Sequence, residues 1–430
     1  STLIKDYGIG GLIFFQGGPV RQTRLLNRFQ SQSRVPLLVA MDGEWGAGMR
    51  LDSVLKFPYQ MSLGAVPVAD SLLIYDMGRE VARQFTRLGM QVNFAPVVDV
   101  NNNPANPVIG FRAWGENPAA VARLSRLYMK GMQDAGVLAV AKHFPGHGDV
   151  DADSHLALPV VRADRERLED LELPPFKSMI ANGIGGMMVA HLSVPALDTV
   201  RGPSTLSKPI VTGMLREQLG FKGVVFTDAM NMKGLISQVP TGEAEVRALL
   251  AGNDVLEFSK NVPLALATVL AAVDSGRISQ ARIDESCRRV LALKQWSGLR
   301  KKPVISEKDI IADLNPAHAR YLAHRLTARS ITLLRNQGNL LPVQRLDTLR
   351  MATLVLGGNP ADTTDFQKAV ASYAPMAHFH LPAAPTLDEL VDIRAKLFGY
   401  DVVLVALQSL GRLPATNFGI APEANLLLRE

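Results

Sequence analysis

Between Lys142 and His155 the sequence concentrates side chains that can carry, donate or accept a proton. Three His, one Lys and three Asp fall within fourteen positions, KHFPGHGDVDADSH, and the Gly and Pro between them fix the path of a loop. The apolar run Val137 to Ala141 comes directly before them. Barrel enzymes place their functional groups in this way, at the end of a buried strand. We therefore expect a site here, rather than a merely solvated surface loop.

Charged and polar residues also follow other apolar runs of the chain. A strand end has little structural need for a charge, whereas the carboxyl rim of a barrel collects functional groups from several strands. A single such residue is explained equally well by a helix cap or a turn. Several together predict one polar pocket. They are Asp42, Asp99, Lys142, His143, His191 and Asp228.

Short apolar runs alternate with amphipathic segments along the first 260 residues, which is typical of parallel βα units. Seven predicted strands indicate an α/β fold with a (β/α)8 barrel of the TIM type, whose missing strand lies before Ser1 or is absent. The predicted strands are Gly10 to Phe15, Val35 to Met41, Val92 to Val98, Val137 to Ala141, Gly186 to Ala190, Gly223 to Thr227 and Asp254 to Phe258. The predicted helices are Leu72 to Leu88, Pro118 to Ala135, Asp164 to Asn182 and Lys208 to Leu219.

A change in composition after residue 299 divides the chain. We expect a catalytic barrel over 1–299, a linker over 300–316 that is rich in charge and bounded by prolines, and a second α/β domain over 317–430. This second domain is short enough to be truncated. Its predicted elements are a helix from Ala317 to Ser330 and strands at Ile331 to Asn336, Thr353 to Gly358 and Val402 to Leu407.

The composition favours a globular enzyme. Of its 430 residues, 47% are hydrophobic and 20% charged, and no apolar run is long enough for a transmembrane helix. The 46 basic and 40 acidic side chains are spread along the chain, so a nucleic-acid partner is not expected. The single cysteine, Cys287, excludes an internal disulfide and a thiolate metal site. The given sequence contains no recognisable signal peptide, and the bacterial cytoplasm and the periplasm or cell envelope both remain possible locations.

Two motifs resemble a known family. KHFPGHGDVDADSH at Lys142 to His155 and GFKGVVFTDAMNMKGL at Gly220 to Leu235 are similar to family 3 glycoside hydrolases, above all to their β-N-acetylglucosaminidase branch. The resemblance covers the chain from about Ile9 to Leu299. It implies a barrel followed by an αβα sandwich domain, and it implies no cofactor and no metal.

The resemblance also implies catalytic roles. Asp228 matches the nucleophile, whose attack on the anomeric carbon forms a covalent glycosyl-enzyme and gives retention of configuration. His155 matches an unusual general acid/base, and Asp153 its dyad partner, which would orient the ring as in an Asp-His pair. An Asx turn beside a surface histidine is the alternative reading of Asp153 and His155.

The same resemblance implies residues that bind the sugar. Around Arg50 the sequence departs from the family pattern, because Trp45 interrupts the residues after Glu44. A histidine bonded within the pocket wall is an equal alternative for His191, and Glu257 is a further candidate for the rim. Glu44, Trp45 and Trp114 are candidates for a sugar-stacking face, although packing is the commoner role of a tryptophan. The residues implied for substrate binding are Asp42, Arg50, Arg112, Lys142, His143 and His191.

The two motifs together predict an exo-acting, retaining β-N-acetylglucosaminidase that acts on terminal β-linked N-acetylglucosamine. The resemblance implies glycans or muropeptides as its substrates and peptidoglycan turnover or recycling as its setting. Three alternatives remain. The first is a β-glucosidase of the same family. The second is a phosphorylase, because a histidine acid/base repels phosphate less than a carboxylate does. The third is a sugar-binding protein without catalysis. The oligomeric state cannot be read from the sequence.

Overall fold

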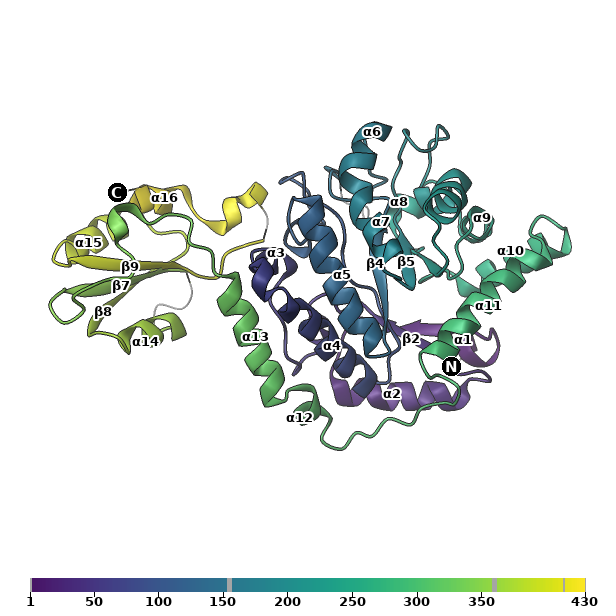
Figure 1. Cartoon of the computed structure of the whole chain (residues 1–430), viewed down its shortest axis with the longest axis horizontal. Coiled ribbons are helices and arrows are strands. Elements are labelled where there is room, and N and C mark those ends of the chain that lie inside the picture. The colour runs from purple at the N-terminus through teal and green to yellow at the C-terminus, as the bar shows by residue number, and fades with distance from the viewer. Residues whose placement is uncertain (1, 153–156, 358–361, 413, 430) are drawn as a thin grey trace. The chain divides into compact units, whose positions relative to one another are not determined.

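The computed structural model describes residues 2–152, 157–357, 362–412 and 414–429, and its chain divides into two compact units, Ser1–Ile331 and Thr332–Glu430 (Figure 1). The first unit is built on a parallel sheet in which each strand pairs with the next one along the chain. Such a sheet requires a crossover between every two strands, and helices supply most of these. Its strands are β1 (Gly11–Ile13), β2 (Leu38–Met41), β3 (Val92–Asn93), β4 (Leu138–Phe144), β5 (Gly186–Val189) and β6 (Val224–Thr227).

Both faces of this sheet are buried, and successive residues of a strand belong to different apolar clusters. In β2, Val39 and Met41 pack in the large cluster that includes the helices, whereas Leu38 and Ala40 pack in a smaller one with Phe94 and Phe226. Side chains alternate between the two faces of a strand, so the second cluster is the inner face of the sheet. Burial on both sides explains why these strands read as continuous apolar runs.

Six of the seven strands predicted in this unit are confirmed, five of them in shorter form, while β4 is longer and extends to Phe144. The seventh, Asp254 to Phe258, is reduced to an isolated bridge between Phe226 and Val255, in which Val255 N–H donates to the carbonyl of Val225 at 3.0 Å. The α/β class and the parallel sheet are thus confirmed. Closure into a barrel of eight strands stays a prediction.

Helices surround the sheet, and those that pack in the large apolar cluster cover its outer face, whereas Leu293 of α11 packs in the cluster of the inner face. The longest helices are α2 (Pro19–Gln32), α4 (Leu72–Arg87), α5 (Pro118–Asp134), α10 (Val262–Asp274), α11 (Gln280–Trp296) and α13 (Ala317–Ser330). Shorter ones are α1 (Thr2–Lys5), α3 (Gln60–Leu63), α6 (Arg165–Arg167), α7 (Leu173–Ala181), α8 (Lys233–Ile236), α9 (Glu243–Ala251) and α12 (Ile310–Leu314). The π-helical segments Leu168–Glu172 and Pro209–Gln218 and the 3-10 turns Ala47–Met49, Val68–Asp70, Gly110–Arg112 and Ser204–Leu206 complete the unit.

The predicted helices are found, with one interruption. The region Asp164 to Asn182 divides into α6, a π turn and α7, and Pro174 and Pro175 lie at the start of α7. Proline has no N–H to donate to the preceding turn, so a break in the regular pattern is tolerated there.

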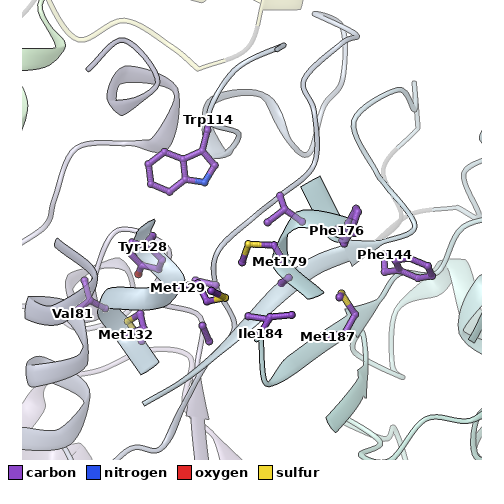
Figure 2. Close-up of a cluster of buried hydrophobic side chains, with 14 of the residues drawn as sticks. Val81, Trp114, Tyr128, Met129, Met132, Phe144, Phe176, Met179, Ile184 and Met187 are labelled. Carbon is purple, nitrogen blue, oxygen red and sulfur yellow. The ribbon is translucent and has the colours of Figure 1, made fainter. Parts of the chain in front are cut away.

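Helices α4 and α5 lie side by side and pack unusually closely (Figure 1). A β-carbon on Gly78 of α4 would lie 2.3 Å from the carbonyl oxygen of Tyr128, and one on Gly131 of α5 would lie 2.1 Å from that of Tyr75. Glycine at these two positions therefore lets the two backbones meet. Figure 2 shows the core beside α5, in which Trp114, Tyr128, Met129 and Phe176 are buried side chains.

The segment 300–316, expected as a linker, and α13, expected in the second domain, both pack on the first unit. Ile310 and Leu314 of α12 and Leu326 of α13 are buried in its large apolar cluster. Arg87 forms an ion pair with Asp313 at 2.8 Å. This burial of apolar side chains extends the first unit to Ile331.

The second unit contains a three-stranded parallel sheet in the order β8-β7-β9. Two of its predicted strands are confirmed, but Ile331 to Asn336 forms no strand, and β8 (Met376–Leu381) was not predicted. In the sequence MAHFHL of β8, apolar and polar residues alternate from Ala377 to Leu381, which fits its partly buried strand, but the run is too short to stand out. The remaining elements are β7 (Met351–Leu356), β9 (Val402–Leu407), α14 (Asp365–Ala371), α15 (Leu387–Leu397), α16 (Pro422–Arg429) and the turns Gln337–Asn339 and Pro414–Gly419.

Within the described part of the chain, every helix is too short or too polar to cross a bilayer.

Candidate active site

A cavity of about 410 Å³ opens at the carboxyl ends of the strands in the first unit. Its wall takes residues from the ends of β2, β4 and β6 and from the segment after the Val255 bridge. Parallel strands bring their carboxyl ends to one edge, so residues far apart in the sequence meet there. The charged and histidine side chains of the wall are Asp42, Glu44, Arg50, Arg112, Lys142, His143, His147, Asp228 and Glu257.

Asp42 accepts two charged hydrogen bonds. Lys142 Nζ lies 2.8 Å from its Oδ1, and Arg50 Nη2 lies 2.6 Å from its Oδ2. Burial alone would raise the pKa of Asp42, but the two cations outweigh it and hold that pKa below its usual value. Asp42 is therefore ionised at neutral pH, with its carboxylate fixed against the cavity.

Glu44 lies behind Asp42 and is fully buried. Arg112 donates to both of its oxygens, with Nη2 2.6 Å from Oε1 and Nε 3.0 Å from Oε2, and Lys142 Nζ lies 2.9 Å from Oε1. Burial opposes the ionised form, yet Arg112 and Lys142 lower the pKa of Glu44 far below its usual value. Glu44 thus holds two substrate-binding candidates in place rather than forming part of a stacking face.

Lys142 connects the two acids, since its single ammonium group contacts both Asp42 and Glu44. Burial lowers the pKa of this amine, but the paired carboxylates raise it further, and the net shift is upward. The resulting cluster places two carboxylates and three cations on one side of the cavity, with every cation in an ion pair.

Asp99 orients the ring of His143, a role that was not predicted for it from the sequence. Nδ1 of His143 lies 2.7 Å from Asp99 Oδ2, and Asp99 also accepts the backbone N–H of His147 at 2.7 Å. Burial raises the pKa of Asp99, but its contacts with His143 and His147 reverse that shift, so the carboxylate is ionised. An ionised acceptor at Nδ1 leaves Nε2 of His143 for other contacts.

His147 also lines the cavity, where 1% of its surface is exposed. Burial, together with the neighbouring His143, lowers its pKa to about 4. The imidazole is therefore neutral at pH 7. His147 lies in the glycine-rich loop of the first motif, but no role was predicted for it from the sequence.

Asp228 follows β6 directly and reaches the cavity wall. Its Oδ1 accepts the backbone N–H of Ala229 at 2.8 Å. Burial raises the pKa of Asp228, but His143, His191 and this backbone bond outweigh it, and the net shift is downward. A carboxylate that is ionised, partly buried and directed to a cavity can act as a nucleophile.

The structure brings most of the predicted site residues together. Asp42, Arg50, Arg112, Lys142 and His143 line the same cavity as Asp228. Asp153 and His155 lie outside the described residues.

His191 lies in the wall behind Asp228 and does not line the cavity. It is fully buried, with Nδ1 2.7 Å from Thr205 Oγ1 and Nε2 3.1 Å from the carbonyl of Ala229. These contacts agree with the wall alternative. Trp114 is 1% exposed and packs against Tyr128 in the core (Figure 2), so it forms no part of the stacking face. Trp45, in contrast, does line the cavity.

Two aromatic rings at the rim were not predicted. Phe15, after β1, and Phe258 have ring centroids 5.3 Å apart, and the guanidinium of Arg50 lies 5.5 Å from the Phe15 centroid. Phe258 is 48% exposed. Both belong to segments predicted as strands, and the sequence does not show that the strands end before these rings.

Comparison with known proteins gives the class of this chain. The family model described as "Glycosyl hydrolase family 3 N terminal domain" matches residues 1–293. The chain therefore belongs to glycoside hydrolase family 3. Curated relatives include beta-hexosaminidase A from Pseudoalteromonas piscicida, 33% identical over 83% of this chain, and a beta-N-acetylglucosaminidase/beta-glucosidase from Cellulomonas fimi, 30% identical over 83%. The chain spans 64% and 65% of the length of these two proteins.

A solved structure extends the similarity through both units. It is that of a family 3 beta-N-acetylglucosaminidase from Paenibacillus sp. str. FPU-7, with a TM-score of 0.81 and 35% sequence identity, and the match covers 99% of this chain and 82% of that one.

Proposed function

We propose that this protein is a retaining exo-β-N-acetylglucosaminidase. The observation that carries the proposal is the ionised carboxylate of Asp228 at the end of β6, facing a cavity that Asp42, Lys142 and Arg112 also line. The names of the relatives support the choice of sugar. In this reading, residues 1–299 form a catalytic domain with an eight-stranded barrel.

In the proposed reaction, Asp228 attacks the anomeric carbon and the bond to the leaving group breaks, which gives a covalent glycosyl-enzyme. His155, oriented by Asp153, donates a proton to the leaving oxygen and then takes one from the water that releases the sugar. Two inversions at one carbon give net retention. Asp42, Arg50, Arg112, Lys142 and His143 are the proposed ligands of the sugar hydroxyls, and His191 supports the wall.

The proposed substrates are β-linked glycans or muropeptides with a terminal N-acetylglucosamine, with cell-wall turnover as the setting. The closed ion-pair cluster supports an exo mode, because hydroxyls at the non-reducing end of a sugar offer donors and acceptors that match a buried carboxylate and ammonium. The bacterial cytoplasm and the periplasm or envelope both suit such a substrate.

Turnover of paired aryl substrates tests this function. The β-N-acetylglucosaminide should be hydrolysed faster than the β-glucoside, and the first sugar product seen by NMR should have the β configuration. A faster reaction of the glucoside would instead identify a β-glucosidase, a second candidate that the double name of the Cellulomonas fimi relative favours.

The same assay in phosphate buffer addresses the remaining alternatives. Appearance of sugar 1-phosphate in place of free sugar would identify a phosphorylase. Binding of the sugar without any turnover would identify a non-catalytic protein and contradict the proposal.

A further inference from the structure

Glu257 is a carboxyl group of the cavity wall for which the proposed reaction gives no role. It follows the Val255 bridge, and its main chain is tied to the segment that carries the nucleophile. Its N–H donates to Thr227 Oγ1 at 2.9 Å, and its carbonyl accepts the N–H of Met230 at 2.9 Å. These two bonds flank Asp228, so Glu257 faces the cavity beside the nucleophile.

The Glu257 side chain has an unused polar atom. Its Oε2 is buried and has no hydrogen-bond partner among the described residues. A buried polar atom without a partner is costly, and a bound ligand can satisfy it. In a cavity of sugar-sized volume, that ligand is a polar group of the substrate.

The charges of the cavity favour a neutral Glu257. The three cations of the wall, Arg50, Arg112 and Lys142, balance Asp42, Glu44 and Asp228. An ionised Glu257 would add an excess negative charge beside two carboxylates. Burial, followed by the charges of Asp42 and Asp228, accordingly raises the pKa of Glu257 well above its usual value, while Lys142 and Arg50 oppose the shift.

The position of Glu257 beside Asp228 determines which atoms of the bound sugar it contacts. Asp228 attacks the anomeric carbon, and a carboxyl group fixed beside Asp228 lies near the atoms bonded to that carbon. These atoms are the ring oxygen and the neighbouring carbon with its substituent. In an N-acetylated sugar this substituent carries a carbonyl oxygen, which is a strong acceptor for an O–H donor.

We infer that Glu257 is a specificity-determining residue that donates a hydrogen bond to the acetamido oxygen of the bound sugar. The inference rests on the proposed function and deepens it. It explains why a fourth acid lies at a wall that already has its nucleophile, and it gives the buried Oε2 a partner in the complex. The other titratable or charged groups of this cavity wall are Asp42, Glu44, Arg50, Arg112, Lys142, His143, His147 and Asp228.

Binding of free N-acetylglucosamine, measured by calorimetry from pH 5 to 9, tests this role without requiring turnover. For the wild type, Kd should rise at least about tenfold as Glu257 ionises, because the donor is lost and a charge is gained. Glu257→Gln keeps a donor without a titrating proton, so its Kd should vary much less with pH. Glu257→Leu should bind about tenfold to a hundredfold more weakly at pH 5.

The control Glu166→Gln, on the exposed first turn of α6, should behave as the wild type. A parallel titration with glucosamine, which lacks the acetyl oxygen, should show no loss of affinity in Glu257→Leu. The inference is overturned if Glu257→Gln retains the wild-type pH dependence, if Glu257→Leu binds N-acetylglucosamine normally, or if glucosamine binds the wild type more tightly. Absence of N-acetylglucosamine binding by the wild type would also overturn it.

Turnover separates this inference from the proposed function. An aryl substrate with a dinitrophenolate leaving group needs no protonation, so its kcat/KM at high pH does not depend on a general acid. In the wild type, kcat/KM should fall at high pH, and in Glu257→Gln this fall should be reduced. If the wild type binds the sugar as expected but hydrolyses nothing, the proposed function fails while the role of Glu257 in binding stands.

Discussion

The four acids of the cavity wall are held in two different ways. Asp42 and Glu44, the paired acids, form ion pairs with Lys142, Arg50 and Arg112. For Asp228 and Glu257, the unpaired acids, no ion pair is found among the described residues; Asp228 accepts a backbone N–H, and Glu257 Oε2 has no donor. A paired carboxylate is an organised binding group, whereas an unpaired one beside a cavity is free to react or to exchange a proton. In the proposed function the paired acids belong to the cluster that binds the sugar, whereas of the two unpaired acids Asp228 attacks it and Glu257 contacts its acetamido group.

The largest effect on activity should come from a change to Asp228, one of the unpaired acids. Asp228→Asn removes the charge of the proposed nucleophile and keeps its shape, so kcat for the aryl N-acetylglucosaminide should fall roughly 10⁴- to 10⁶-fold. Circular dichroism should show an unchanged fold. Activity within tenfold of the wild type would contradict the assignment of the nucleophile.

A change to the paired acids or their cations should lower the stability of the fold as well as the activity. Lys142→Met leaves two buried carboxylates that have lost one cation, so the free energy of unfolding should fall by about 3–5 kcal/mol in urea titrations. Lys130→Met, at an exposed pair with Asp134, should change it by less than about 1 kcal/mol. Equal losses of unfolding free energy in the two variants would show that the buried ion pairs of the cavity stabilise the fold no more than an exposed pair does.

Asp99 differs from both groups of acids, because its partner is a histidine. Asp99→Asn weakens the bond that orients His143, and kcat/KM should fall about 10- to 100-fold, the loss expected for one charged hydrogen bond. His143→Gln in the same background should add little further loss, because the two residues act through one contact. Fully additive losses would show that Asp99 acts elsewhere.

The smallest effect concerns the dependence of stability on pH. Asp42, Asp99 and Asp228 have lowered pKa values, so they stabilise the fold above the pKa of the unfolded chain, and this contribution is lost as the pH falls through the folded values. Glu257 has a raised pKa, so its contribution is lost as the pH rises through the folded value. Glu257→Gln should remove this second loss, which we expect to be a few degrees of Tm between pH 5 and 8. Identical Tm profiles would argue against a neutral Glu257.

Local signals predicted a large part of this site. Six strands of the sheet and the polar residues at their ends follow from apolar runs and their boundaries. The meeting of Asp42, Lys142, His143 and Asp228 at one edge follows from parallel topology.

Other features depend on contacts between distant residues, which local patterns do not encode. Glu44 and Arg112 are separated by 68 positions, and Asp99 and His143 by 44. Trp114 and Trp45 look alike in sequence, and only tertiary packing buries one in the core and places the other at the cavity. The strand β8 was missed although Ala377 to Leu381 alternate between apolar and polar residues, because this run of five residues is short and its two polar positions are histidines.

The amino end of the sheet carries a consequence for synthesis of the protein. Lys294 of α11 donates to the carbonyl of Gly10 at 3.1 Å, across 284 positions of the chain, and to that of Pro36 at 2.7 Å. The neighbouring Leu293 and Leu299 fill the inner face of the sheet. Because the chain emerges from the ribosome in order, the first two strands are made long before the lysine that completes them. The nascent sheet must therefore remain open at this end until α11 arrives, and the ribosome has by then already supplied every cavity residue.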